Sequence, residues 1–296
     1  MALYAFDGTW NKEYTAEGDL ARNTNVKRFF ELYEGVRNFH VAGVGTKLGI
    51  AGRILGGAFG LSGTAGVREM YGCLRRNYEA DDRRIDVVGF SRGAAMALDF
   101  VNLIAKEGVV DDRKTPRITF LALFDAVGSF GLNLNAGGPA KFQDWDVGYA
   151  QTLPDNVDLC CHALALDERR QTFAVHRVRH PNAHEVWFAG VHTDVGGGNG
   201  NLGLNDISLR WMGMMAARAN VPGFVAQRVK AATSRWNSAA RVSPPPPYDL
   251  VQNKWRRVLP KDRVHFSVTL PRPDYNNPDR ETVLTENEEE AVVGGV

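Results

Sequence analysis

The chain has few cysteines, no excess of one charge and no long apolar run. Its three cysteines, Cys73, Cys160 and Cys161, make no disulfide framework, because the adjacent pair could close only a strained ring. We expect reduced thiols packed inside the protein. No apolar run is long enough to span a bilayer, and residues 1–6 lead into Asp7 without the pattern of a secretory signal. This predicts a protein that is cytoplasmic as synthesised, and it leaves open export by a system that needs no cleavable signal.

Charge is balanced over the whole chain. There are 35 Lys and Arg residues against 34 Asp and Glu, a formal net charge of +1, so no basic field for nucleic acid is expected. With 44% hydrophobic and 23% charged residues, the 296 residues suit one large globular domain, which we predict over 1–296. Four arginine pairs are scattered along the chain, and we interpret them as solvated surface: Arg75-Arg76, Arg83-Arg84, Arg169-Arg170 and Arg256-Arg257.

Familiar cofactor and metal motifs are also absent. The sequence contains no HExxH, no CxxC and no GxxxxGK[ST], and no complete GxGxxG follows the second predicted strand. His176, His180 and His184 recur every four residues, but Pro181 prevents them from sharing one helix. We therefore expect no cofactor, and no metal at these histidines.

What is present is an alternation of strands and helices. Two weakly patterned segments, 43–66 and 126–160, are predicted to cover a site, the first as a mobile lid or as a packed loop. The alternation predicts an α/β fold with a mostly parallel sheet, helices on both faces and function at the carboxyl ends of the strands. Strands are predicted at 3–6, 39–42, 84–88, 117–124 and 185–189, and helices at 67–78, 94–105, 205–219 and 224–236.

One serine lies between two glycines at a predicted strand-to-helix turn. The stretch is Gly89-Phe90-Ser91-Arg92-Gly93. So tight a turn holds the serine in a strained conformation, and a Cβ at Gly89 or Gly93 would collide with the neighbouring strand or helix. This is the nucleophile-elbow pattern of α/β-hydrolases, and it predicts an α/β-hydrolase-like fold. The plainer alternative is a turn in which Ser91 only caps the helix.

Two more polar residues follow predicted strands. Asp125 ends the strand at 117–124 and His192 follows the strand at 185–189, so the order serine, acid, histidine is that of α/β-hydrolases. We predict that His192 takes the Ser91 proton and that Asp125 holds the imidazole in one tautomer. Otherwise Asp125 would be a turn cap and His192 a loop histidine. Asp194 competes with Asp125, but it lies only two residues from His192 and is predicted to brace the loop.

The oxyanion of such a reaction needs two N–H donors. The N–H of Arg92, directly after the nucleophile, is one predicted donor. The other is predicted at Gly8 or Thr9, in the loop that follows the first strand. Asp7 in the same loop is predicted to support the site.

Several longer stretches carry a resemblance to a known family. The chain resembles the α/β-hydrolase-type catalytic domain of the type VI secretion phospholipase effectors, from the first strand to about residue 215. The resemblance implies hydrolysis of carboxylic esters, above all lipid esters, with Ser91 as nucleophile, Asp125 as acid and His192 as base. An immunity protein is a further partner that this family raises. A transient contact with a membrane surface is predicted separately, because Leu, Ile and Phe residues lie among the glycines of 43–66 and could touch lipid. The matching stretches are Phe6 to Asn11, Thr24-Asn25-Val26, Gly43 to Thr46, Gly56 to Gly60, Gly89 to Ala94, Phe124 to Ser129, Ala165 to Arg170, Trp187 to Gly198 and His265 to Val268.

Two other functions stay open from the sequence. Asp7, His192 and Asp194 could hold a divalent ion for a metal-dependent hydrolase. A hydrolase fold could also serve as a non-catalytic binding protein. Labelling of Ser91 by a fluorophosphonate would oppose a pure binding role. Activity that is lost in a chelator but kept in Ser91→Ala would favour the metal.

Overall fold

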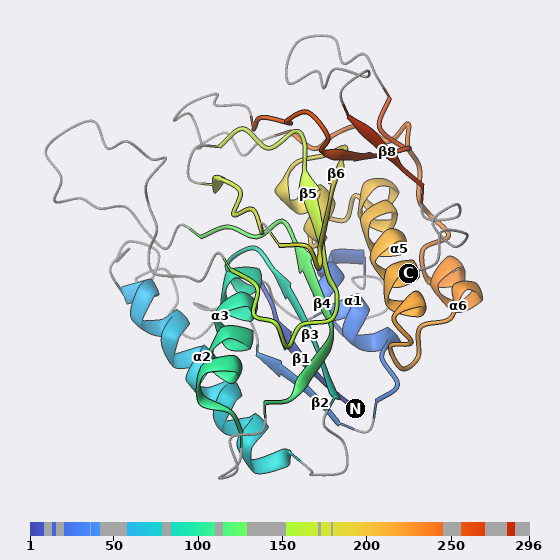
Figure 1. Cartoon of the computed structure of the whole chain (residues 1–296). Helices are drawn as coiled ribbons and strands as arrows, with labels where there is room; N and C mark the ends of the chain where they lie inside the picture. The colour runs from blue at the N-terminus through green and yellow to red at the C-terminus, as the bar shows by residue number, and fades with distance from the viewer. Residues whose placement is uncertain are drawn as a thin grey trace, which may run out of the picture.

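A parallel sheet of eight strands forms the centre of the chain (Figure 1). Its spatial order is β2-β1-β3-β4-β5-β6-β7-β8, and every pairing is parallel. The strands are β1 (Ala2–Phe6), β2 (Arg37–Val41), β3 (Arg84–Phe90), β4 (Arg117–Phe124), β5 (Cys160–Ala165), β6 (Ala183–Phe188), β7 (Arg263–His265) and β8 (Leu284–Glu286). This computed structural model describes residues 1–8, 14–15, 21–35, 37–41, 58–78, 84–109, 115–128, 152–170, 173–178, 180–244, 256–269 and 283–287.

Helices cover both faces of the sheet (Figure 1). On one face lie α2 (Ala58–Asn77) and α3 (Arg92–Glu107), and on the other lie α1 (Asn25–Leu32), α5 (Leu202–Arg218) and α6 (Ala226–Ala232). The one-turn helix α4 (His192–Gly196) follows β6. Among the described residues, no helix is both long enough and apolar enough to cross a membrane. The arrangement confirms the predicted α/β class.

Alternate residues of the central strands face opposite apolar layers. In β1, Leu3 and Ala5 belong to the layer that contains Phe29 of α1. Tyr4 and Phe6 belong to the other layer, where both rings pack on Phe100 of α3 at centroid distances of 5.3 Å. Both faces of the sheet are buried, so apolar residues are needed at every position of such a strand. Its sequence is therefore a continuous apolar run and does not alternate between apolar and polar residues.

The structure adds elements that the sequence patterns did not predict, namely α1, α4, β5, β7 and β8. The most consequential is β5, which lies between β4 and β6 and is buried at all six residues. Its sequence Cys-Cys-His-Ala-Leu-Ala has no β-branched residue, so strand propensity did not identify it. Cys160 and Cys161 are free, buried thiols in this strand, and Cys73 is free and half-buried.

The two predicted cover segments are described only in part. Helix α2 begins at Ala58 rather than at 67, so residues 58–66 of the first segment are helical. Residues 43–57 lie outside the described part of the chain, and so do residues 129–151 of the second segment. A role as a lid therefore remains a prediction.

The strand order reverses direction at the carboxyl ends of β1 and β3. The chain runs from β1 outward to β2 and then returns past β1 to form β3. Such a reversal separates the loops that follow the two strands, and open α/β sheets bind their ligands there. Asp7 and Gly8 follow β1, and Ser91 follows β3.

Candidate active site

Ser91 occupies a strained turn between β3 and α3. Its φ of 59° and ψ of −127° lie in a region that non-glycine residues rarely adopt. The turn is anchored by main-chain bonds: the Ser91 N–H donates to the Phe124 carbonyl at 3.0 Å, and the Ser91 carbonyl accepts from Val127 N at 3.2 Å. The side chain makes no helix-capping bond. Ser91 is therefore held by its backbone, and its hydroxyl is left to other partners.

The glycines on either side of Ser91 are required by close backbone contacts. A Cβ built on Gly89 would lie 2.7 Å from Ala94 Cα, inside α3. A Cβ built on Gly93 would lie 2.3 Å from the Phe6 carbonyl oxygen, at the end of β1. Since both neighbours are main chain, neither can move away cheaply. Strand β1 and helix α3 thus approach each other through Gly93.

We predict that Gly93→Ala lowers the free energy of unfolding by about 2 kcal/mol, because the added methyl must push α3 away from β1. Urea denaturation measures the change. Gly72→Ala is the matched control, since its Cβ would meet only the flexible end of Arg76 at 3.3 Å within α2. That variant should be unchanged or more stable by about 0.5–1 kcal/mol. Equal losses of unfolding free energy in the two variants would contradict the conclusion that Gly93 is required by the close approach of α3 to β1.

Asp125 lies directly after β4, in a left-handed conformation with φ of 43°. Its N–H donates to the Ala163 carbonyl of β5 at 2.8 Å, and its Oδ1 accepts from Ala165 N at 2.9 Å. The side chain is fully buried. The edge of β5 therefore fixes both the backbone and the carboxylate of Asp125.

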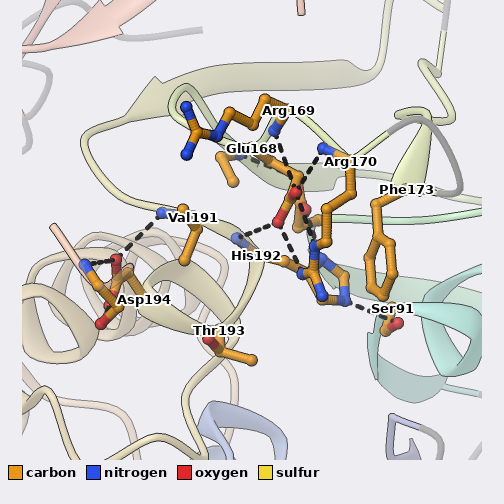
Figure 2. A network of polar contacts seen from close by, with 12 residues as sticks. Ser91, Glu168, Arg169, Arg170, Phe173, Val191, His192, Thr193 and Asp194 are labelled. Carbon is orange, nitrogen blue, oxygen red and sulfur yellow. Dashed lines mark hydrogen bonds and ion pairs between the residues drawn. The ribbon is translucent and has the colours of Figure 1, made fainter. Parts of the chain in front are cut away.

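His192 is brought to Asp125 and Ser91 as the first residue of α4. Its Nδ1 lies 2.6 Å from Asp125 Oδ2. Its Nε2 lies 2.8 Å from Ser91 Oγ, as Figure 2 shows. The imidazole packs between two aromatic rings, Phe90 at a centroid distance of 4.7 Å and Phe173 at 4.8 Å. With Asp125 ionised, Nδ1 carries the proton of the neutral imidazole, and this N–H donates a hydrogen bond to the carboxylate. Nε2 is then left to accept a hydrogen bond from the Ser91 hydroxyl.

Burial and charge keep this pair in the required ionisation states. Burial lowers the pKa of His192, and it outweighs the opposing effect of the Asp125 and Glu168 carboxylates. Burial alone would raise the pKa of Asp125, but the Arg256 guanidinium and His192 together hold that pKa below its ordinary value. At neutral pH the site thus contains a neutral imidazole beside a carboxylate.

Glu168 fixes the backbone of His192. Its Oε2 accepts from the His192 N–H at 3.1 Å and from Arg170 Nη2 at 2.7 Å (Figure 2). The Arg170 guanidinium lies 3.6 Å above the Phe173 ring, whose edge faces His192. The Arg169-Arg170 pair was interpreted as solvated surface, and for Arg170 this is wrong, because only 11% of its side chain is exposed.

The sequence interpretation also missed Arg256. Its Nη1 donates to Asp125 Oδ1 at 2.5 Å and its Nη2 donates to Asp125 Oδ2 at 3.0 Å. The same nitrogens donate to the carbonyls of Ala165 at 2.9 Å and Phe173 at 2.7 Å. Only 5% of the side chain is exposed, so the expectation of a solvated arginine is wrong here too. No local signal marks this residue, because its partners lie far away in the sequence.

Asp194 does not contact His192. Its Oδ2 accepts from Val191 N at 3.1 Å and from Ser243 N at 2.9 Å, and Figure 2 shows its carboxylate turned away from the His192–Ser91 pair. Its Oδ1 accepts from Asn199 and Asn201. These contacts tie Asp194 to the chain before and after α4 and to the segment around Ser243.

Asp7 has partners of its own. Its Oδ2 accepts from Thr24 Oγ1 at 2.9 Å and its Oδ1 accepts from Gly8 N at 2.7 Å. Within the described residues, no group of three or more His, Cys, Asp and Glu side chains is arranged to hold a metal ion. The predicted set of Asp7, His192 and Asp194 is thus not gathered into one site.

Two of the predicted oxyanion donors, Arg92 and Gly8, lie at the start of α3 and just after β1. Arg92 is the first residue of α3. Gly8 follows β1, and its N–H is engaged by Asp7 Oδ1. Thr9 lies outside the described residues. The contact of Gly93 with the Phe6 carbonyl brings the two segments together.

The geometry can be compared with known proteins. The model of the family described as the type VI secretion phospholipase effector Tle1-like catalytic domain matches residues 3–116 and 111–214. The chain belongs to this family. The match confirms the resemblance carried by the motifs, and the Tle1-like family name indicates hydrolysis of lipid esters.

Solved structures resemble the Tle1-like chain at low identity, and no curated protein matches it. An uncharacterized protein from Pseudomonas aeruginosa aligns with a TM-score of 0.52 at 20% identity, over 80% of this chain and 48% of that one. The Tle1 effector bound to the VgrG spike of the type 6 secretion system aligns with a TM-score of 0.48 at 20% identity, over 66% and 50%. The first likeness shows the fold alone. The chain spans about half the length of these solved proteins.

Proposed function

We propose that this Tle1-like chain is a serine hydrolase that cleaves the carboxylic esters of lipids, phospholipids among them. One observation carries the proposal: the hydrogen bonds run without a break from Ser91 Oγ to His192 Nε2, and from His192 Nδ1 to Asp125 Oδ2. A serine hydroxyl is a weak nucleophile until a base in contact with it takes its proton. His192 is in that position, and Asp125 stabilises the imidazolium that forms.

The reaction has two halves. In the first, Ser91 Oγ attacks the ester carbonyl carbon while its proton passes to His192 Nε2. The tetrahedral intermediate then collapses, the carbon–oxygen bond to the alcohol breaks, and His192 protonates the departing alkoxide. In the second half, water attacks the acyl-enzyme, its proton passes to His192, and Ser91 regains a proton as the acid leaves.

N–H groups from two segments would stabilise the oxyanion. We assign them to Arg92 at the start of α3 and to Gly8 or Thr9 after β1. Donors preorganised toward the developing charge are among the largest contributions to such catalysis. The Gly8 N–H donates to Asp7 Oδ1 in the structure. To stabilise the oxyanion, this N–H must turn away from Asp7 or donate to both acceptors at once.

The test combines covalent labelling with turnover. We expect a fluorophosphonate to label wild type at Ser91 and not to label Ser91→Ala. A chain-length series of p-nitrophenyl esters, assayed beside a phospholipid, should show turnover by wild type alone, and the preferred acyl chain separates a lipase from a small-ester esterase. Turnover that is equal in the two proteins, or absent from both, would overturn the proposal. Loss of turnover in a chelator would point to a metal instead.

Family membership also motivates proposals about partners and domain organisation. We propose that residues 1–296 act as one catalytic domain, that export uses a secretion system without a cleavable signal, and that the substrate is met at a membrane surface through transient contact. An immunity protein that blocks the site would be the expected partner in the producing cell. Co-purification with the product of a neighbouring gene, and flotation with phospholipid vesicles, test these two partners.

A further inference from the structure

Arg256 makes contacts that a simple triad does not need. Each oxygen of Asp125 accepts from one nitrogen of this guanidinium, at 2.5 and 3.0 Å, while Oδ2 also faces His192. Paired, planar contacts of this kind are the strongest that an arginine makes with a carboxylate. The residue lies beyond residue 214, where the family match ends.

The contacts of Arg256 span three parts of the site. Besides Asp125, its nitrogens bind the carbonyl of Ala165, at the end of β5, and that of Phe173, whose ring packs on His192. One side chain thus joins the acid, the neighbouring strand and the wall of the imidazole pocket. Its side chain is 5% exposed and that of Asp125 is fully buried, so water screens their interaction little.

We propose that Arg256 is a positioning residue that fixes the Asp125 carboxylate toward His192 and keeps His192 unprotonated in mildly acidic solution. A carboxylate beside an isolated imidazole attracts a proton onto it. With Arg256 on both of its oxygens, the charge of Asp125 is largely compensated and this attraction is weakened. His192 is then free to act as a base at a pH at which an imidazole beside an uncompensated carboxylate would already be protonated on both nitrogens and inactive. The inference deepens the proposed function and rests on it for its catalytic meaning.

Other charged groups also face His192. Glu168 accepts from its N–H, and the Arg170 guanidinium, bound to Glu168, lies next to Phe173. Because Glu168 and Arg170 pair with each other, their charges largely cancel at the imidazole. Asp125 with Arg256 is the pair in direct contact with the ring nitrogen, and Ser91 on the other nitrogen is neutral.

Three variants separate charge from geometry. Arg256→Gln removes the charge, whereas Arg256→Lys keeps the charge but loses the paired contacts. Arg28→Gln is the matched control, since Arg28 is also buried and binds a buried carboxylate, Asp206, at 2.5 Å and the Ala232 carbonyl at 3.2 Å. It should lose stability as Arg256→Gln does, without affecting the ionisation of His192.

The first readout is NMR titration of the His192 imidazole, which does not depend on turnover. In wild type we expect an imidazole that protonates below the ordinary pKa of a histidine, because it is buried. In Arg256→Gln its pKa should rise by about one pH unit, a tenfold change in proton affinity, with Arg256→Lys close to wild type. Protonation of wild-type His192 at or above the ordinary pKa of a histidine would overturn the proposal, even if Arg256→Gln fails to fold.

The second readout is kcat/KM between pH 5 and 9, with the best ester from the labelling study. With each protein normalised to its own value at pH 8.5, the acid limb of Arg256→Gln should lie about one pH unit higher than that of wild type. The proposal would be overturned if the acid limb of the kcat/KM profile stayed in place in Arg256→Gln. It would also be overturned if that limb moved equally in Arg28→Gln. If the imidazole shifts as expected but no protein turns over ester, the proposed function fails while the role of Arg256 toward His192 stands.

Discussion

Replacing Asp125 with asparagine is expected to lower kcat for ester hydrolysis by about 10⁴-fold, as the loss of the acid does in other serine hydrolases. The carboxylate accepts from Arg256 on both oxygens and from His192 Nδ1 on one of them. An amide has only one acceptor oxygen, so its NH₂ group must face a donor on one side. His192 would change tautomer, its Nε2–H would point at Ser91, and it could no longer act as a base.

Asp194→Asn provides the matched comparison for Asp125→Asn. Asp194 is buried and lies two residues from His192, but it binds Val191, Ser243 and two asparagines instead of the imidazole. Its replacement should reduce stability and lower kcat by no more than about tenfold, because the loop loses a brace while the tautomer is kept. Full activity in Asp125→Asn with a large loss in Asp194→Asn would move the acid role to Asp194.

The second large effect concerns stability and arises at Asp86 in β3. This side chain is fully buried, and the Tyr33 hydroxyl donates to its Oδ2 at 3.0 Å. Burial raises its pKa from 3.8 to about 7, against the opposing effect of the Tyr33 hydrogen bond. The folded protein therefore binds a proton that the unfolded chain has released, and the free energy of unfolding falls as the pH rises from about 4 to about 7.

Asp86→Asn should abolish this loss. Its free energy of unfolding relative to wild type should increase by on the order of 3 kcal/mol between pH 4 and pH 9, because asparagine stays neutral and still accepts from Tyr33. Urea denaturation at a series of pH values measures the difference. Asp155→Asn, at an exposed turn before β5, removes a carboxylate with the same change of net charge and should show no such trend. A difference that shrinks as the pH rises would contradict the assignment.

The tight strand-to-helix turn at Ser91 was predictable from the sequence because all its requirements are local. A buried strand, two glycines and an apolar helix lie within some twenty consecutive residues, and the contacts that exclude a Cβ at Gly89 come from Ala94, only five positions away. The strand at 117–124 was predictable for a similar reason, since burial of both faces gives a continuous apolar run ending at Asp125. His192 was predicted in the same way, because it closely follows the strand predicted at 185–189.

Strand β5 shows where local patterns fail. Its residues have weak strand propensity, and they are held as a strand by pairing with β4 and β6 on either side. Yet β5 supplies the Ala163 carbonyl and the Ala165 N–H that fix Asp125. Asp125 could be singled out from the sequence as a candidate acid, but the strand that orients its carboxylate could not.

By itself, therefore, the sequence determined the α/β class, the family and the order of Ser91, Asp125 and His192. Strand-to-helix turns and buried strands depend mainly on consecutive residues, so they can be recognised without the tertiary structure. Only the tertiary structure decided which acid faces His192, that Asp194 braces the loop, and that Arg256 lies buried on Asp125 across 131 positions of sequence. An arginine carries the same local pattern whether water or a buried carboxylate surrounds it. Its environment comes into being only when the sheet brings distant segments together.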